Sequence, residues 1–166
     1  MAMIIREATK DDCVALAVLN GEVQKLHADA YPDVFKWPTD PLELSTYFTE
    51  AILNPQHRIF IGELDGEPIG YIQCEEVQRG GNALCLAQAF IYVHHLVVKS
   101  THRNQGYGKQ LMRAVVEFAK ASGNKALRLD YWSFNREAAE FFARQGFSAY
   151  REFAWVSIPD GSDVRS

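Results

Sequence analysis

The amino-acid sequence predicts a mixed α+β fold, in which a central sheet carries helices on both faces. Strand-like and helix-like segments alternate in the order β-α-α-β-β-β-α-β-α-β, and such an order is typical of layered α and β structure. The chain has 166 residues, 48% of them apolar and 23% charged, which suffices for one domain with its own hydrophobic core. The sequence contains no repeat and no low-complexity tract, so we expect a single domain over residues 1–166.

The first half of the chain predicts a strand, two helices and a hairpin. Thr9 and Asp12 have capping-box spacing and begin the first helix, which could break at Gly21. Asp65 and Gly66 separate two runs of strand-forming residues, a strong hairpin signal. In chain order, the predicted elements are a strand over residues 3–8, a helix over 9–30, an ordered loop over 31–41, a helix over 42–53 and a hairpin over 57–77.

The second half predicts alternating strands and helices. Apolar residues recur at helical spacing after Gly108, and Gly123 and Gly146 stand where C-capping glycines are expected. In chain order, the predicted elements are a buried strand over residues 84–98, a helix over 107–122, a strand over 125–132, a helix over 135–146 and one or two final strands over 147–158.

Charge is distributed unevenly along the chain. Residues 1–76 hold fourteen acidic against five basic side chains, whereas residues 77–116 hold five basic side chains and no acidic one. An electropositive block in an acidic chain favours a locally bound anionic ligand and a cationic partner, although chance placement of solvated charges gives the same pattern. A sequence pI of about 5.7 disfavours a nucleic-acid partner.

Cysteine usage and hydropathy favour a cytoplasmic protein. The three cysteines are widely spaced and form no CxxC pair, so neither a disulfide framework nor a zinc site is indicated, and we expect no metal. No apolar run reaches the roughly 18 residues of a membrane span. The first twelve residues carry acidic side chains where a signal peptide would be basic and then apolar.

The stretch VVKSTHRNQGYGKQLM places two glycines where a helix begins. It does not match the Walker A loop, because Gln110 follows Lys109, nor the Rossmann fingerprint, because Leu111 stands where the third glycine would be. A strand that leads through a glycine turn into a helix nevertheless points free N–H groups and the positive end of the helix dipole at one place. With Arg103 nearby, this predicts a phosphate site; alternatively, the glycines only allow helix and strand to pack closely.

Two motifs here resemble the GNAT superfamily, the acyl-CoA-dependent N-acetyltransferases. Arg103, Gly106 and Gly108 occupy the fixed places of its motif A, Q/R-x-x-G-x-G/A. A second match follows about 25 residues later and is similar to motif B: Asn135, Ala138, Phe141, Gly146 and Phe147. The resemblance covers nearly the whole chain. It implies a mostly antiparallel mixed sheet whose fourth and fifth strands splay apart to admit acetyl-CoA, the co-substrate.

The resemblance also implies which residues bind the cofactor. Backbone amides in motif A would bind the pyrophosphate, the fourth strand would pair with pantetheine, and an asparagine of motif B would contact the pantetheine arm. Phe142 stands where motif B usually has a tyrosine that protonates the thiolate, so Tyr131, Tyr150, Ser133 or water would take that role. The implied cofactor-binding residues are Leu96, Val97, Val98, Arg103, Asn104, Gln105, Gly106, Tyr107, Gly108, Lys109, Asn135 and Phe142.

The expected catalytic residues lie on the fourth strand. Strand alternation places Tyr92, His94 and Leu96 on one face and His95 on the other. The resemblance puts Tyr92 where some family members carry a glutamate base, and His94 where others carry a histidine on the proton path. We expect His94 to act as the general base through water, with Tyr92 beside it; the alternative is a structural histidine.

The acceptor is expected to be a cationic amine, either a small molecule or a peptide. The acidic first half and the aromatic loop with Tyr31, Phe35 and Trp37 would form the acceptor side, with Glu75 and Glu76 as candidate contacts. The rival hypothesis is a binding module that senses acyl-CoA without turnover, as Phe142 would allow. The sequence leaves the oligomeric state open, a homodimer included.

Overall fold

The computed structural model describes residues 3–158 and contains a five-stranded sheet of order β1-β2-β3-β4-β5. Neighbouring strands are antiparallel except β4 and β5, which are parallel. The mixed α+β fold expected from the sequence is confirmed. The strands are β1 (Ile4–Glu7), β2 (His57–Leu64), β3 (Glu67–Arg79), β4 (Gln88–Val98) and β5 (Leu127–Leu129).

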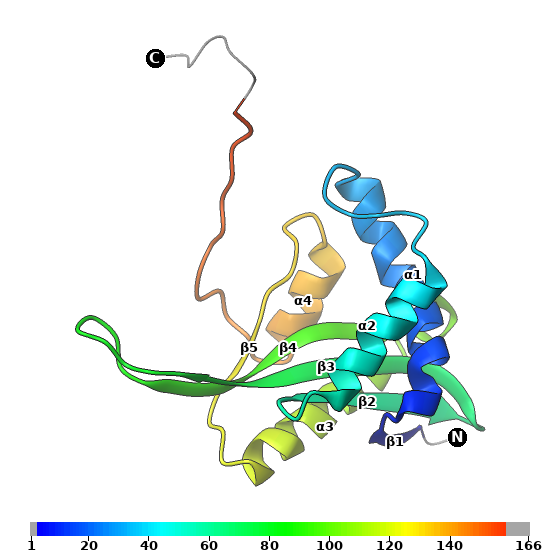
Figure 1. The fold of residues 1–166 in the computed structure, drawn as a ribbon, viewed down its shortest axis with the longest axis horizontal. Coiled ribbons are helices and arrows are strands. Elements are labelled where there is room, and N and C mark those ends of the chain that lie inside the picture. The colour runs from blue at the N-terminus through cyan, green and yellow to red at the C-terminus, as the bar shows by residue number, and fades with distance from the viewer. Residues whose placement is uncertain (1–2, 159–166) are drawn as a thin grey trace. The chain divides into compact units, whose positions relative to one another are not determined.

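Helices cover both faces of the sheet (Figure 1). One face packs against two helices, α1 (Cys13–Ala30) and α2 (Pro41–Leu53), and the other against α3 (Tyr107–Ala121). Two short 3-10 turns, η1 (Lys10–Asp12) and η2 (Ser100–His102), precede α1 and α3. Helix α4 (Arg136–Arg144) belongs to a second compact unit that begins at Asn135. Within residues 3–158, no helix is long and apolar enough to cross a membrane.

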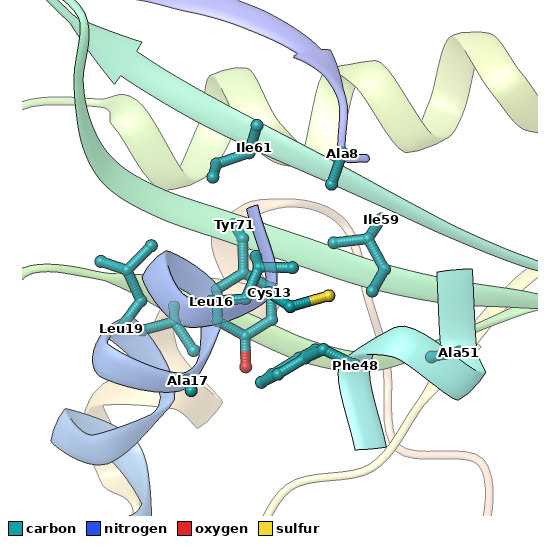
Figure 2. Close-up of a cluster of buried hydrophobic side chains, with 11 residues drawn as sticks. Ala8, Cys13, Leu16, Ala17, Leu19, Phe48, Ala51, Ile59, Ile61 and Tyr71 are labelled. Atoms are coloured by element: carbon teal, nitrogen blue, oxygen red, sulfur yellow. The ribbon is translucent and has the colours of Figure 1, made fainter. Parts of the chain in front are cut away.

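The main core lies between α1, α2 and the sheet (Figure 2). Tyr71 of β3 and Phe48 of α2 are both fully buried, and their rings meet edge to face with centroids 5.5 Å apart. Large apolar side chains buried in this way each contribute about 1.5–3 kcal/mol. The cluster is formed by Ala8, Cys13, Leu16, Ala17, Leu19, Phe48, Ala51, Ile59, Ile61, Tyr71 and Val97.

Helix α1 continues through Gly21, so the possible break there does not occur. Leu16 and Leu19 before the glycine, and Ala28 after it, are buried. Burial on both sides outweighs the roughly 1 kcal/mol that one glycine costs in a helix.

Strand β4 begins four residues later than predicted, at Gln88 rather than at residue 84. Leu84 and Leu86 are 94% and 86% exposed. The Asn82 side-chain oxygen accepts hydrogen bonds from the N–H groups of Leu84 and Cys85, at 2.8 and 2.9 Å. This Asx turn closes the β3–β4 loop and keeps its apolar residues out of the strand.

The final strands expected over residues 147–158 are not formed: the structure assigns none of these residues to a strand. Strand β5 is also shorter than predicted, with only three residues. Phe153, Trp155 and Ile158 are at least 68% exposed. Aromatic and β-branched residues form strands only when a neighbouring strand supplies a ladder and a packing surface, so the composition of this segment misled the prediction.

Arg6 of β1 holds two carboxylates at the start of α1. Its guanidinium donates to Asp12 at 2.7 and 2.8 Å and to Glu63 at 2.6 Å. The N–H of Thr9 donates to Asp12 Oδ2 at 2.7 Å, as part of the predicted capping box. The hydrogen bonds from Arg6 lower the pKa of Asp12 to about 2.

We expect stability to fall when the pH drops from about 4 to about 2. The folded protein holds the pKa of Asp12 at about 2, so the unfolded chain takes up a proton first and the stabilisation is lost across this range. The loss should be about 1–2 kcal/mol after allowance for the solvent around Arg6. Urea unfolding at several pH values measures it. Asp12→Asn should flatten the dependence, whereas Asp29→Asn, which removes the exposed pair with Lys25, should not.

Candidate active site

A β-bulge in β4 places two adjacent histidines on the same face of the sheet. In the β3–β4 register, His95 lies opposite Gln73 and Val93 opposite Cys74, so His94 is an extra residue without a counterpart. His95 approaches the buried Tyr71 hydroxyl, at 3.2 Å. His94 reaches Glu75, which lies on the Tyr71 face because alternate residues of a strand share a face.

The expectation that His95 points away from His94 is therefore wrong. Leu96 also leaves the predicted face, because it lies opposite Ile72, a neighbour of Tyr71 on β3. One inserted residue shifts the two-residue period of a strand and reverses the face of every side chain beyond it.

His94 is paired with a carboxylate. Its Nε2 lies 2.8 Å from Glu75 Oε2. A carboxylate only accepts, so Nε2 donates and the lone pair of the neutral ring is on Nδ1. The His57 ring stacks on that of His94, with centroids 5.4 Å apart and planes 7° apart. Burial lowers the pKa of His57. This arrangement can take up a proton at His94 Nδ1 and stabilise the resulting imidazolium through Glu75.

Tyr92 stands beside this histidine, with ring centroids 5.0 Å apart. Its hydroxyl donates to Asp130, which directly follows β5, at 2.5 Å. Burial, together with this hydrogen bond, raises the pKa of Tyr92 above its ordinary value. The phenol stays protonated at neutral pH, so Tyr92 does not serve as a base.

His95 is a structural histidine. Asn20 Nδ2 donates to the Tyr71 hydroxyl at 2.8 Å, and that hydroxyl lies 3.2 Å from His95 Nδ1. Burial lowers the pKa of His95 to about 4, so its ring is neutral at physiological pH. A structural role therefore suits His95.

Strands β4 and β5 part in the middle of β4. Their ladder ends at the pair Val93–Leu129, whereas β4 continues to Val98. Lys99 N–H donates to Ile69 on β3. Backbone groups alternate sides along a strand, so those of Val98 and Leu96 point away from β3, toward the open side. This is the predicted splay, and it turns these backbone groups of β4 toward a ligand, although the Val98 carbonyl already accepts from Arg103.

The turn after β4 presents a helix N-terminus. Asn104 and Gly106 have positive φ values of 61° and 84°, and Gly106 is the N-cap of α3. The first backbone hydrogen bond of the helix runs from Gln110 N–H to the Gly106 carbonyl at 3.2 Å, so the amides of residues 107–109 precede it. A Cβ on Gly106 would meet no protein atom within 4 Å. Its φ therefore explains this glycine, and close helix–strand packing does not.

Glu22 of α1 fixes the start of this turn. Its carboxylate accepts from the Ser100 N–H at 2.8 Å and lies 3.5 Å from the Arg103 guanidinium. Arg103 Nε also donates to the Val98 carbonyl at 3.2 Å. Arg103 is thus held against the end of β4, which defines the path of the chain into α3.

The model of the acetyltransferase (GNAT) family matches residues 20–147. The chain belongs to this family. The match includes the splayed strands and the glycine turn, and it confirms the family resemblance of motifs A and B.

Several named N-acetyltransferases are similar to this GNAT protein. An uncharacterized N-acetyltransferase of Methanocaldococcus jannaschii is 24% identical over 86% of this chain, which spans only 59% of that relative's length. An uncharacterized N-acetyltransferase of Bacillus subtilis, YhfO, is 25% identical over 87% of this chain and 89% of its own. The expectation of an enzyme agrees with these names.

Solved structures share the fold of this GNAT protein. A mutant of the BH1408 protein from Bacillus halodurans superposes with a TM-score of 0.87 at 24% identity, over 94% of this chain and 99% of that one. An aminoglycoside N-acetyltransferase in complex with CoA gives 0.74 at 18% identity, over 95% of both chains.

The second unit of this GNAT protein contains motif B. Asn135 caps α4, and its side-chain oxygen accepts from the Ala138 N–H at 3.0 Å. Phe142 packs against Phe141 and Phe147, with ring centroids 5.2 and 5.8 Å apart. Asn135 and Phe142, which the resemblance implies for cofactor binding, thus also cap the helix and pack the aromatic cluster of their own unit.

The aromatic loop of this GNAT protein gathers rings from distant segments. Tyr31 and Phe35 each lie 5.0 Å from Trp132, measured between centroids. Residues 32–38 line a hollow of about 460 Å³. Glu76, proposed as an amine contact, instead accepts from Asn124 at 2.8 Å, and alternation along β3 places it on the opposite face from Glu75.

Sequence reasoning missed three residues of this region. Glu22, His57 and Asp130 contact Ser100, His94 and Tyr92, respectively. No motif marks them, because each contact joins segments that only the folded sheet brings together.

Proposed function

We propose that this GNAT protein transfers an acetyl group from acetyl-CoA to a primary amine, by direct attack in a ternary complex. One observation carries the proposal: the open edge of β4 leads from the His94–Glu75 pair directly into the glycine turn at the N-terminus of α3. His94, the proposed proton acceptor, thus lies at one end of this short stretch of β4. The N-terminus of α3, the proposed anion site, lies at the other.

The helix end suits the pyrophosphate of CoA. Amides from Asn104 to Lys109, together with the positive end of the α3 dipole, would bind the two phosphates. Backbone groups of Leu96 and Val98 would pair with pantetheine, as an added strand pairs with an open edge. Asn135 and Phe142 are the further cofactor contacts that the motif B resemblance implies.

The reaction needs a proton acceptor and an oxyanion donor. An ammonium of pKa about 10 must lose its proton before it attacks, and His94 Nδ1 would take that proton through water, with Glu75 stabilising the imidazolium. The N–C bond forms while the oxyanion accepts from a β4 amide. The C–S bond then breaks, and the nitrogen gives up its second proton to the departing thiolate or to water.

The acceptor we propose is a small cationic amine with an apolar or aromatic body. Three observations support this class. Glu75 beside His94 and the aminoglycoside acetyltransferases among the solved structures of the same fold support a small cationic amine, and the rings of the aromatic loop support the apolar or aromatic body. A peptide amine is the competing acceptor.

Thiol release from acetyl-CoA across an amine panel tests the proposal. The panel should include aminoglycosides, polyamines, arylalkylamines and lysine peptides, after calorimetry has measured CoA binding. We expect CoA to bind and at least one small amine to be acetylated. Turnover of peptides alone would contradict the acceptor class. Binding of CoA without any turnover would favour the sensor that Phe142 suggested, and absence of CoA binding would overturn both.

A further inference from the structure

Three potential metal ligands converge on the face of the sheet that holds His94. His57, Glu75 and His94 each offer one ligand atom, and all three atoms lie within 4.8 Å of one another. Glu75 Oε2 is central, 2.8 Å from His94 Nε2 and 3.9 Å from His57 Nε2. All three side chains are partly accessible, with exposed fractions of 17–30%.

The strand register explains why these residues meet. His57 of β2 lies directly opposite Glu75 of β3, and directly opposed side chains point to the same face. The bulge in β4 adds His94 to that face. The ligands therefore stand on three hydrogen-bonded strands, which hold them more rigidly than a loop would.

We propose that these three side chains form a binding site for a divalent transition metal of the zinc class. Two imidazoles and one carboxylate are a common ligand set for zinc when a fourth position stays open to water. Zinc–ligand bonds of about 2.0–2.2 Å would require the His57 and His94 rings to turn out of their stacked arrangement, in which the ring planes lie 7° apart, so that both Nε2 lone pairs point at the metal. Mg²⁺ and Ca²⁺ prefer oxygen ligands and would bind poorly.

Two polar side chains, Gln73 and Tyr47, lie behind the His57 ring. Gln73 Nε2 lies 3.4 Å from His57 Nδ1, and the Tyr47 hydroxyl donates to Gln73 Oε1 at 3.2 Å. A metal on Nε2 requires the proton on Nδ1, and a flip of the Gln73 amide would present an oxygen to that N–H. Metal-bound histidines usually have such an acceptor.

A metal bound at this site would prevent His94 from acting as the proposed base. A neutral imidazole that binds metal through Nε2 keeps its single proton on Nδ1, the atom that would receive the proton of the amine. The metal would also replace the hydrogen bond between His94 and Glu75. Inhibition rests on the proposed function, whereas metal binding does not.

Metal binding is tested on the tag-free full chain after chelator treatment. We expect one Zn²⁺ per chain by calorimetry, and visible Co²⁺ absorption bands of low coordination number. His57→Ala and Glu75→Gln should each remove the heat and the bands. His102→Ala, which changes a histidine outside the cluster, should bind as the wild type does. Circular dichroism and CoA titration show whether each variant is folded.

Three outcomes would overturn the site: no binding by the wild type, unchanged binding by His57→Ala, or thiolate-to-cobalt charge-transfer bands, which would place the metal on cysteine. If an acceptor amine is found, Zn²⁺ at saturation should abolish turnover of the wild type, and a chelator should restore it. In His57→Ala, Zn²⁺ should no longer affect the turnover that remains. Full turnover of the zinc-bound wild type would overturn the link to the base.

Discussion

Gly106→Val is expected to weaken CoA binding by at least about 100-fold, or about 2.7 kcal/mol. Gly106 has a φ of 84°, which a β-branched residue adopts only with strain. A valine would also project into the open space beside the amides that are proposed to bind the pyrophosphate. Calorimetric titration with CoA measures the loss.

Gly123→Val is a matched control, because it separates ligand binding from backbone strain. Gly123 has a φ of 75° and stands at the opposite end of the same helix, also with nothing within 4 Å of a built Cβ. Both variants should melt at a lower temperature than the wild type, but Gly123→Val should bind CoA normally. Equal CoA affinities for the two variants would contradict the phosphate site.

His94→Gln is expected to lower kcat/KM by about 10²–10⁴-fold, the usual contribution of a general base. In the wild type, Glu75 accepts from His94 at 2.8 Å, and a glutamine at this position can still donate to it. An amide, however, does not take up a proton at neutral pH. CoA binding should be unchanged, because the glycine turn is intact. Steady-state kinetics with a saturating acceptor amine provides the measurement.

The acceptor amine itself supplies the control for His94→Gln. An amine with a pKa well below 7 is already neutral and needs no base, so the variant should recover most of the wild-type rate with it. If the variant lost activity equally with both kinds of amine, His94 would be a positioning residue rather than the base.

Much of the proposed cofactor site could be located from the sequence because its signals are local. The glycine turn, the helix that follows it and the capping glycine lie within about 20 consecutive residues. At the turn and at the cap, the backbone needs a positive φ, which glycine adopts without strain. Gly106, with its positive φ at the N-cap of α3, is the clearest case. The family match over residues 20–147 confirms the resemblance that the two motifs carry.

Predictions made from side-chain alternation and residue composition were wrong where strand formation or side-chain direction depended on a neighbouring strand. Residues 147–158 have strand composition but are not assigned to a strand. Simple alternation placed His94 and His95 on opposite faces, but the bulge places both on one. The hydrophobic pattern of a segment does not show whether a partner strand is present, or whether the strand contains a bulge.

The sequence by itself determined the family, the order of most elements and the turn that suits a diphosphate, because these depend on residues close together in the chain. Only the tertiary structure decided what surrounds His94. The strand register brings His57, Glu75 and His94 within 4.8 Å of one another, although they belong to three separate strands. The physical reason is that register and bulges come from packing across the whole sheet, and a shift of one residue reverses which side chains meet.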